Sequence, residues 1–253
     1  MFDSIKGKWP KHNTFIMCSC DSKYFNKFFP RFYKTFNKHW KLPIHVHLID
    51  PTKEDLQRLD NLSISHTYCE TQEYNWSESI KTFKFAFPGY ALKPDSTVKQ
   101  WLYECYCQCQ RFVVMGSNIK KSQSVCIADV DCYAINNPNK KEIKHLFSNT
   151  SLSLYRGRIM ATFGNYNGRH KDLFNTIKNE ILSTSKNSFV IGLDQKVLKN
   201  VLYNQLGSFT TLSTKYIWHD DVRGNDHDKC LVFHQKGTRG KNQEVKVKWT
   251  DIE

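Results

Sequence analysis

Apolar runs and helical stripes alternate along the first half of the chain, which is the pattern of an α/β protein. Residues 14–18 form a continuous apolar run that predicts a buried strand, and Asp21 then stands where a helix N-cap is expected. The predicted helix carries aromatic side chains at spacings of three and four residues, so one of its faces should pack against a sheet. These aromatic positions are Phe25, Phe28, Phe29, Phe32, Phe36 and Trp40.

The alternation continues downstream. A long apolar-striped helix is expected from Val98 onward, closed by Gly116, and it leads into an apolar strand that begins at Ser124. Strand order of this kind predicts one α/β domain over residues 1–253, with a mixed, mostly parallel sheet flanked by helices. Further strands are expected at residues 44–49, 62–68, 152–155 and 159–163, and further helices at 54–59, 173–182 and 195–206.

The charge balance indicates an anionic partner. Lys and Arg total 37 against 24 Asp and Glu, a formal charge of +13, which suits a nucleotide, a nucleic acid, a phosphorylated glycan or an anionic membrane surface. Scattered lysines are also typical of a solvated surface. No apolar run is long enough to span a membrane, residues 1–11 lack a signal-peptide core, and nine cysteines without a Cys-x-x-Cys pair favour reduced thiols. We therefore expect a cytoplasmic protein.

The strand that begins at Ser124 is expected to end in two carboxylates, Asp129 and Asp131. Side chains alternate faces along a strand, so these two should point the same way and can share one divalent cation. Like charges at the end of a buried strand need a positive partner, because their repulsion otherwise raises a pKa or weakens the fold. The alternative is a solvated turn after the strand. The pair predicts a cation or phosphate site at the carboxyl edge of the sheet.

Further segments stand in order around this pair. The segment CDSKY at residues 20–24 gives an Asp-x-x-Tyr element, Arg111 lies in the preceding helix, GLDQ at 192–195 gives Asp-Gln, and FHQKG at 233–237 gives His-x-x-Gly. With Asp129-Val130-Asp131, this set resembles the GT-A glycosyltransferases, and within them the glycogenin and bacterial galactosyltransferase-like family (glycosyltransferase family eight). The resemblance runs through nearly the whole chain as an order of motifs.

The resemblance implies a Rossmann-like GT-A domain with a nucleotide-binding half (residues 12–135), an acceptor-side half (136–230) and a basic segment (231–253) that closes over the diphosphate. It implies metal-dependent transfer of a sugar from a UDP- or GDP-linked donor to an acceptor hydroxyl, with Mn²⁺ or Mg²⁺ as the cation. The implied metal ligands are Asp129, Asp131 and His234. The implied donor-binding residues are Ser19, Tyr24, Arg111, Asp129, Gly237, Arg239 and Lys241, and the implied catalytic residues are Asp194 and Gln195.

A non-basic Gln195 beneath the sugar favours retention, since an inverting enzyme needs a carboxylate base, for which Asp194 is the alternative. Residues 160–165 do not match the family's sugar-contacting Asn-Ala-Gly-like stretch, so the sugar stays open. Shortened intervals between motifs suit a small viral or phage member in the host cytoplasm. For such a member the expected acceptor is a hydroxymethylated base of DNA, which is an anionic partner. The other expected acceptors are a glycan and a protein.

Each site residue also has a structural interpretation. Tyr24 can be a core aromatic, Arg111 a surface ion-pair partner, Asp194 a helix N-cap, and His234 a hydrogen-bonded core histidine.

A competing function class stays open. It is a basic nucleic-acid-binding protein, or a metal-dependent nuclease that uses Asp129 and Asp131. Such a nuclease needs a further acidic residue and a lysine close by, for which Lys140, Lys141 and Glu142 are the candidates, although they also look like the start of a helix. The sequence indicates no oligomeric state.

Overall fold

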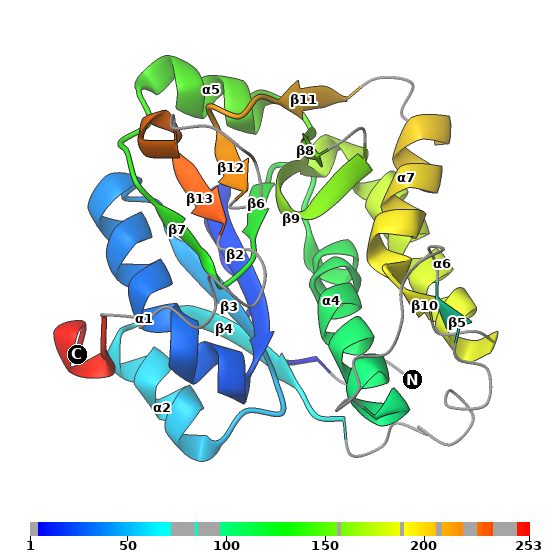
Figure 1. Cartoon of the computed structure of the whole chain (residues 1–253), viewed down its shortest axis with the longest axis horizontal. Helices are drawn as coiled ribbons and strands as arrows, with labels where there is room; N and C mark the ends of the chain where they lie inside the picture. Colours follow the sequence, from blue (N-terminus) through cyan, green and yellow to red (C-terminus); the bar gives the residue numbers. More distant parts are fainter. Residues whose placement is uncertain are drawn as a thin grey trace.

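The computed structural model describes residues 5–71, 84–85, 97–155, 158–187, 190–205, 209–219, 227–234 and 247–253 (Figure 1). Its helices are α1 (Ser22–His39), α2 (Lys53–Asn61), α4 (Val98–Asn118), α5 (Lys140–Ser148), α6 (Lys171–Asn187) and α7 (Leu193–Gln205). Its strands are β1 (Lys6–Gly7), β2 (Thr14–Asp21), β3 (Ile44–Ile49), β4 (Ser65–Cys69), β5 (Lys84–Phe85), β6 (Ser124–Ala128), β7 (Cys132–Ala134), β8 (Ser151–Tyr155), β9 (Arg158–Asn167), β10 (Val190–Ile191), β11 (Thr210–Leu212), β12 (Ile217–His219) and β13 (Val232–His234).

One mixed, mostly parallel sheet organises the protein. Within the described residues it has eight strands in the order β1-β4-β3-β2-β6-β9-β8-β11. Strands β4, β3, β2 and β6 run parallel, whereas β9 is antiparallel to both of its neighbours. The α/β class and the flanking helices predicted from the sequence are thus confirmed. The division into a nucleotide-binding half and an acceptor-side half stays a prediction.

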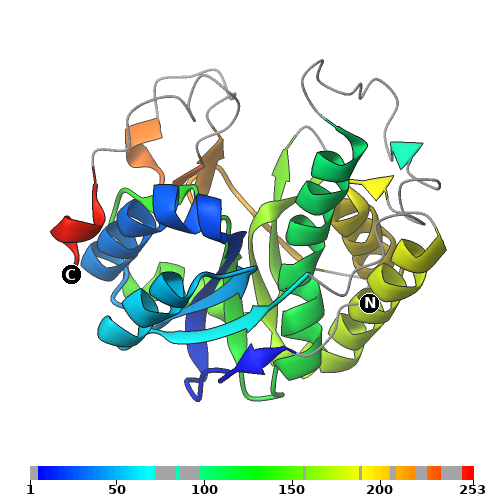
Figure 2. The ribbon, with the colours of Figure 1, turned by 90° about the horizontal axis from the view of Figure 1, so that it is seen from below.

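Helices cover both faces of this sheet (Figures 1 and 2). Helices α1 and α2 lie on one side, and α4, α6 and α7 lie on the other. The alternation of strand β2 therefore fills two cores: Phe15 and Met17 pack under α4, while Ile16 and Cys18 pack under α1. A strand that is buried on both faces reads as a continuous apolar run, which is why residues 14–18 could be recognised in the sequence.

The start of α1 follows the sequence prediction closely. The side chain of Asp21 accepts a hydrogen bond from the Tyr24 backbone N–H at 2.8 Å and so caps the helix. The aromatic stripe of α1 is buried against the sheet, and Trp249 near the carboxyl end of the chain packs on Phe25 and Phe29. The cap and the aromatic packing hold the first turn of α1 in place against the sheet.

Several boundaries predicted from the sequence are wrong: β9 continues past residue 163 to Asn167, α6 continues past residue 182 to Asn187, and two further boundaries differ as follows. Gly116 does not end α4, which continues to Asn118. The glycine instead allows α6 to pack closely, because a Cβ there would lie 2.5 Å from the Phe174 carbonyl oxygen. The strand expected to reach Asp131 stops at Ala128. The next residues form a turn in which the Cys132 N–H donates to the Asp129 carbonyl at 2.9 Å.

Among the helices that the structure describes, none is both long and apolar enough to cross a membrane.

Candidate functional site

A pocket opens where the carboxyl ends of β2 and β6 lie side by side. Ser19 and Tyr24 line it from β2 and the start of α1, Arg111 from α4, and Asp129 and Asp131 from the turn after β6. The pocket is also lined by Thr162 of β9 and by Asp194 and Gln195 at the start of α7. The carboxyl edge of an α/β sheet is where such folds bind ligands, because the loops that leave the strands converge there. The structure thus brings segments distant in sequence into one pocket.

Arg111 is the central charge of this pocket. Its side chain is 7% exposed, pairs with Asp129 through one guanidinium nitrogen, and lies 3.7 Å from Asp194 Oδ2 through another. Burial alone would lower the pKa of Arg111, but the two carboxylates outweigh it and raise the pKa above its usual value. A surface ion pair is therefore the wrong interpretation of Arg111. The guanidinium holds two carboxylates from different elements together.

Asp194 is buried and its carboxyl group is incompletely paired. Burial raises the pKa of Asp194 to about 6, and the nearby Arg111 charge opposes the rise only in part. The residue lies inside the first turn of α7, which begins at Leu193, so it is not the N-cap that the structural interpretation required. Its Oδ1 atom has no hydrogen-bond partner among the described residues.

Two hydroxyl groups of the pocket share this property. Within the described part of the chain, the buried Ser19 Oγ and Thr162 Oγ1 also lack a hydrogen-bond partner, and both residues line the pocket. Buried polar atoms in native proteins nearly always have a partner, so each exception calls for an explanation. Three such atoms lie around this pocket, where a polar ligand can satisfy them, while among the described residues Gln110 and Tyr166 carry unpartnered buried atoms outside its lining.

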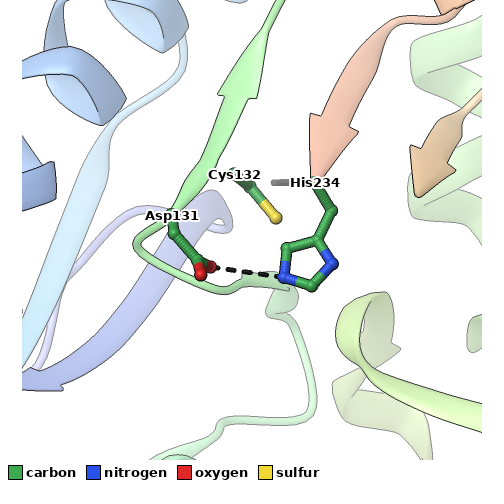
Figure 3. Close-up of side chains that lie close together, drawn as sticks. All are labelled: Asp131, Cys132 and His234. Atoms are coloured by element: carbon green, nitrogen blue, oxygen red, sulfur yellow. Dashed lines mark ion pairs between the residues drawn. The ribbon is translucent and has the colours of Figure 1, made fainter. Parts of the chain in front are cut away.

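His234 lies beside the aspartate turn. Its Nε2 is 3.3 Å from Asp131 Oδ1 (Figure 3). The same atom is 3.7 Å from Asp129 Oδ2. Strand β13 pairs with β7 antiparallel, with His234 directly opposite Cys132, so the two side chains stand on the same face. One ligand atom each from Asp131, Cys132 and His234 lies within 4.8 Å of the others. The donor set of carboxylate, imidazole and thiol suits a divalent transition metal.

Sequence reasoning gave Cys132 and Thr162 no role in the site. The signal for Cys132 was its position directly after the Asp129–Asp131 pair, but cysteines in apolar segments are usually buried thiols. Asp129 is directed to Arg111 and falls outside the three-residue group that could hold a metal in the described residues. Mn²⁺ or Mg²⁺ held by Asp129, Asp131 and His234 stays a prediction.

The remaining predicted residues divide into two groups. Tyr24 is half-buried beside Phe28, with ring centroids 5.3 Å apart, and it lines the pocket as Gln195 does. Its two interpretations, as a core aromatic and as a ligand contact, are therefore compatible. The predicted donor contacts Gly237, Arg239 and Lys241 lie outside the described residues.

Of the residues proposed for a nuclease, Glu142 has structural partners. Asn139 caps α5 and forms a capping box with Glu142, whose carboxylate also pairs with Lys215 at 2.5 Å. Glu142 is not among the residues that line the pocket. The helix start expected at Lys140 is confirmed.

A scan of the chain against models of protein families gave no match, and a search of curated proteins gave none either.

Proposed function

We propose that this protein is a metal-dependent glycosyltransferase of GT-A type, similar to glycosyltransferase family eight. In this proposal it moves a sugar from a UDP- or GDP-linked donor to an acceptor hydroxyl. The observation that carries the proposal is the meeting of the predicted motifs at one pocket: Tyr24, Arg111, the aspartate turn, and Asp194 with Gln195 all line it. His234 lies against the same aspartate turn.

A sugar diphosphate would need a cation in this pocket, because acidic side chains outnumber Arg111 among the described residues that line it. Arg111 lies between Asp129 and Asp194, so its position need not change during a reaction. The unpartnered Ser19 Oγ and Thr162 Oγ1 are donors that hydroxyl or phosphate oxygens can satisfy. Tyr24 lines the pocket and is the aromatic side chain that this proposal assigns to the nucleobase.

Asp131 and His234 are the residues that would hold the cation, with Asp129 at its edge. A divalent cation would stabilise the negative charge that develops on the leaving diphosphate. Gln195 carries no basic group, so the residues beneath the sugar favour retention of configuration. Asp194, with a pKa raised by burial to about 6, is largely ionised at neutral pH and is the alternative base.

The net charge of the chain narrows the class of acceptor. At +13 the chain favours an anionic acceptor. A hydroxymethylated DNA base would combine a polyanionic backbone with a reactive hydroxyl, and a glycan or protein hydroxyl is the other option. Binding of DNA that weakens steeply with salt would support the first acceptor, whereas no binding at low salt would remove it.

A thermal-shift screen with Mn²⁺ tests the proposal against the nucleic-acid-binding alternative. We expect UDP or GDP to raise the melting temperature, because a ligand that binds the folded state stabilises it. Asp131→Ala should abolish that rise, whereas Asp60→Ala, which removes an exposed carboxylate of α2, should keep it. Stabilisation by oligonucleotides alone, with no effect of any nucleoside diphosphate, would show that the transferase assignment is wrong.

A further inference from the structure

Cys132 occupies the position of a metal ligand. It is 1% exposed and lies directly opposite His234 in the antiparallel pairing of β7 and β13, while Asp131 precedes it in the turn. Figure 3 shows its sulfur atom on the same side as the Asp131 carboxylate and the His234 ring. The three residues reach this point from a turn and two strands, so the fold positions them before any ion binds.

The spacing of the ligand atoms suits direct coordination. Ligand atoms in a tetrahedral Zn²⁺ site stand roughly 3.3–3.8 Å apart, given bonds of about 2.0–2.3 Å. Asp131 Oδ1 and His234 Nε2 are already 3.3 Å apart. All three ligand atoms lie within 4.8 Å of one another, so the thiol needs only a small side-chain rotation.

Cys132 differs in this respect from a cysteine that only fills the core. Cys126 on β6 belongs to the same apolar cluster and is equally buried. The metal-capable group that the described residues form contains Cys132 and does not contain Cys126. The Cys132 thiol makes a long contact of 3.9 Å to the Thr162 carbonyl, a weak interaction that metal binding can replace.

We propose that Cys132 is the third protein ligand of this site, and that the site selects a thiophilic dication such as Zn²⁺ over Mn²⁺ or Mg²⁺. Thiolate ligands favour Zn²⁺ and its neighbours, whereas sites built from oxygen favour Mg²⁺ and Mn²⁺. The inference rests on the proposed function, since it concerns the cation that the transferase would use. It replaces the expectation of Mn²⁺ or Mg²⁺ with a softer metal.

Co²⁺ provides a spectroscopic test that needs no catalytic activity. Metal-free protein is titrated with Co²⁺ under reducing conditions, and the thiolate-to-Co²⁺ charge-transfer band in the near ultraviolet is recorded. We expect the band in the wild type and in Cys126→Ala, and its loss in Cys132→Ala. Should Cys132→Ala fail to fold, His234→Gln removes a ligand without touching a cysteine and should also lose the band.

Competition dialysis measures the selectivity. Loss of the thiolate should weaken Zn²⁺ binding by more than the ~10–100-fold that loss of an outer-shell partner costs. Mn²⁺ binding should change much less. Co²⁺ binding without a charge-transfer band, or equal Zn²⁺ affinity in Cys132→Ala and the wild type, would overturn the inference while leaving a metal-dependent transferase intact. A band that depends on Cys132, in a protein that binds no nucleoside diphosphate, would support the inference and contradict the proposed function.

Discussion

Two buried polar clusters lie at the sheet, and they differ in how completely their groups are paired. In the first, on β3 and β4, His45 contacts Ser65 Oγ and Thr67 Oγ1, both at 3.1 Å. His47 contacts Thr67 Oγ1 at 3.0 Å and Cys69 Sγ at 3.6 Å. Every ring nitrogen of this histidine cluster has a partner, so it needs nothing from outside the protein.

The second cluster, the pocket built around Arg111, is incomplete. Asp194 Oδ1, Ser19 Oγ and Thr162 Oγ1 have no partner in the part of the chain that the structure describes. Both clusters are buried polar groups in an apolar sheet, and burial alone does not distinguish them. The difference in pairing indicates that the first cluster supports the fold and the second is prepared for a ligand.

The largest expected effect is at the centre of the incomplete cluster. Arg111→Met leaves the Asp129 and Asp194 carboxylates without their shared cation, which should lower the free energy of unfolding by about 3–5 kcal/mol. Lys6→Met removes an exposed partner of Glu70 and should cost less than about 1 kcal/mol. Chemical denaturation measures both. Equal losses in the two variants would mean that Arg111 has no special role.

Acid should act first on the histidine cluster. Burial, with the neighbouring His47 charge, lowers the pKa of His45 to about 3, and burial lowers that of His47 to about 3. The folded state then binds fewer protons than the unfolded state below about pH 6.5, so stability is lost as the pH falls. Between pH 6.5 and 5 the loss should reach at most about 2 kcal/mol for each histidine.

His47→Gln keeps a polar side chain and removes the titration, so its stability should depend less steeply on pH than that of the wild type. The same change at exposed His12 is the control. Denaturation at pH 7 and pH 5 gives the slope. A wild-type slope that His47→Gln leaves unaltered would contradict the assignment of a neutral, buried imidazole.

A pair of threonine variants compares the clusters directly. Thr67→Val should cost about 1–3 kcal/mol, because it leaves nitrogens of both His45 and His47 unpaired. Thr162→Val removes a buried hydroxyl that has no partner among the described residues, so stability should stay the same or rise slightly. The contrast disappears if the pairing of these hydroxyls has no energetic meaning.

The smaller of the two pH effects is expected at Asp194, and its sign is opposite to that of the histidines. Because burial raises the pKa of Asp194 to about 6, ionisation costs stability above that pH, and the cost is relieved as the pH falls toward the ordinary value. The wild type should therefore lose about 1 kcal/mol relative to Asp194→Asn on going from pH 5 to pH 8. A difference that stays constant over this range would show an unperturbed carboxyl group.

The sequence predicted the local parts of this structure best. The strand at residues 44–49 matches β3, and the cap at Asp21 and the aromatic stripe of α1 were recognised because both depend on neighbours within a few residues. The end of α4 was missed, because the approach of Phe174 to Gly116 involves a distant helix.

In the candidate site, too, the sequence predicted local features and missed contacts between distant segments. The aspartate pair could be read from the sequence, whereas the pairing of Cys132 with His234 joins strands a hundred residues apart and depends on register. The contact of Arg111 with Asp194 likewise needs the packing of α4 against α7.

Calorimetric titration of UDP and GDP tests the central claim most directly, with Asp131→Asn as the comparison and with metal present or chelated. The account predicts that at least one nucleoside diphosphate binds the wild type with metal present. It predicts that chelation and Asp131→Asn each remove that binding. Binding of neither nucleotide, or binding that survives both chelation and Asp131→Asn, would contradict it.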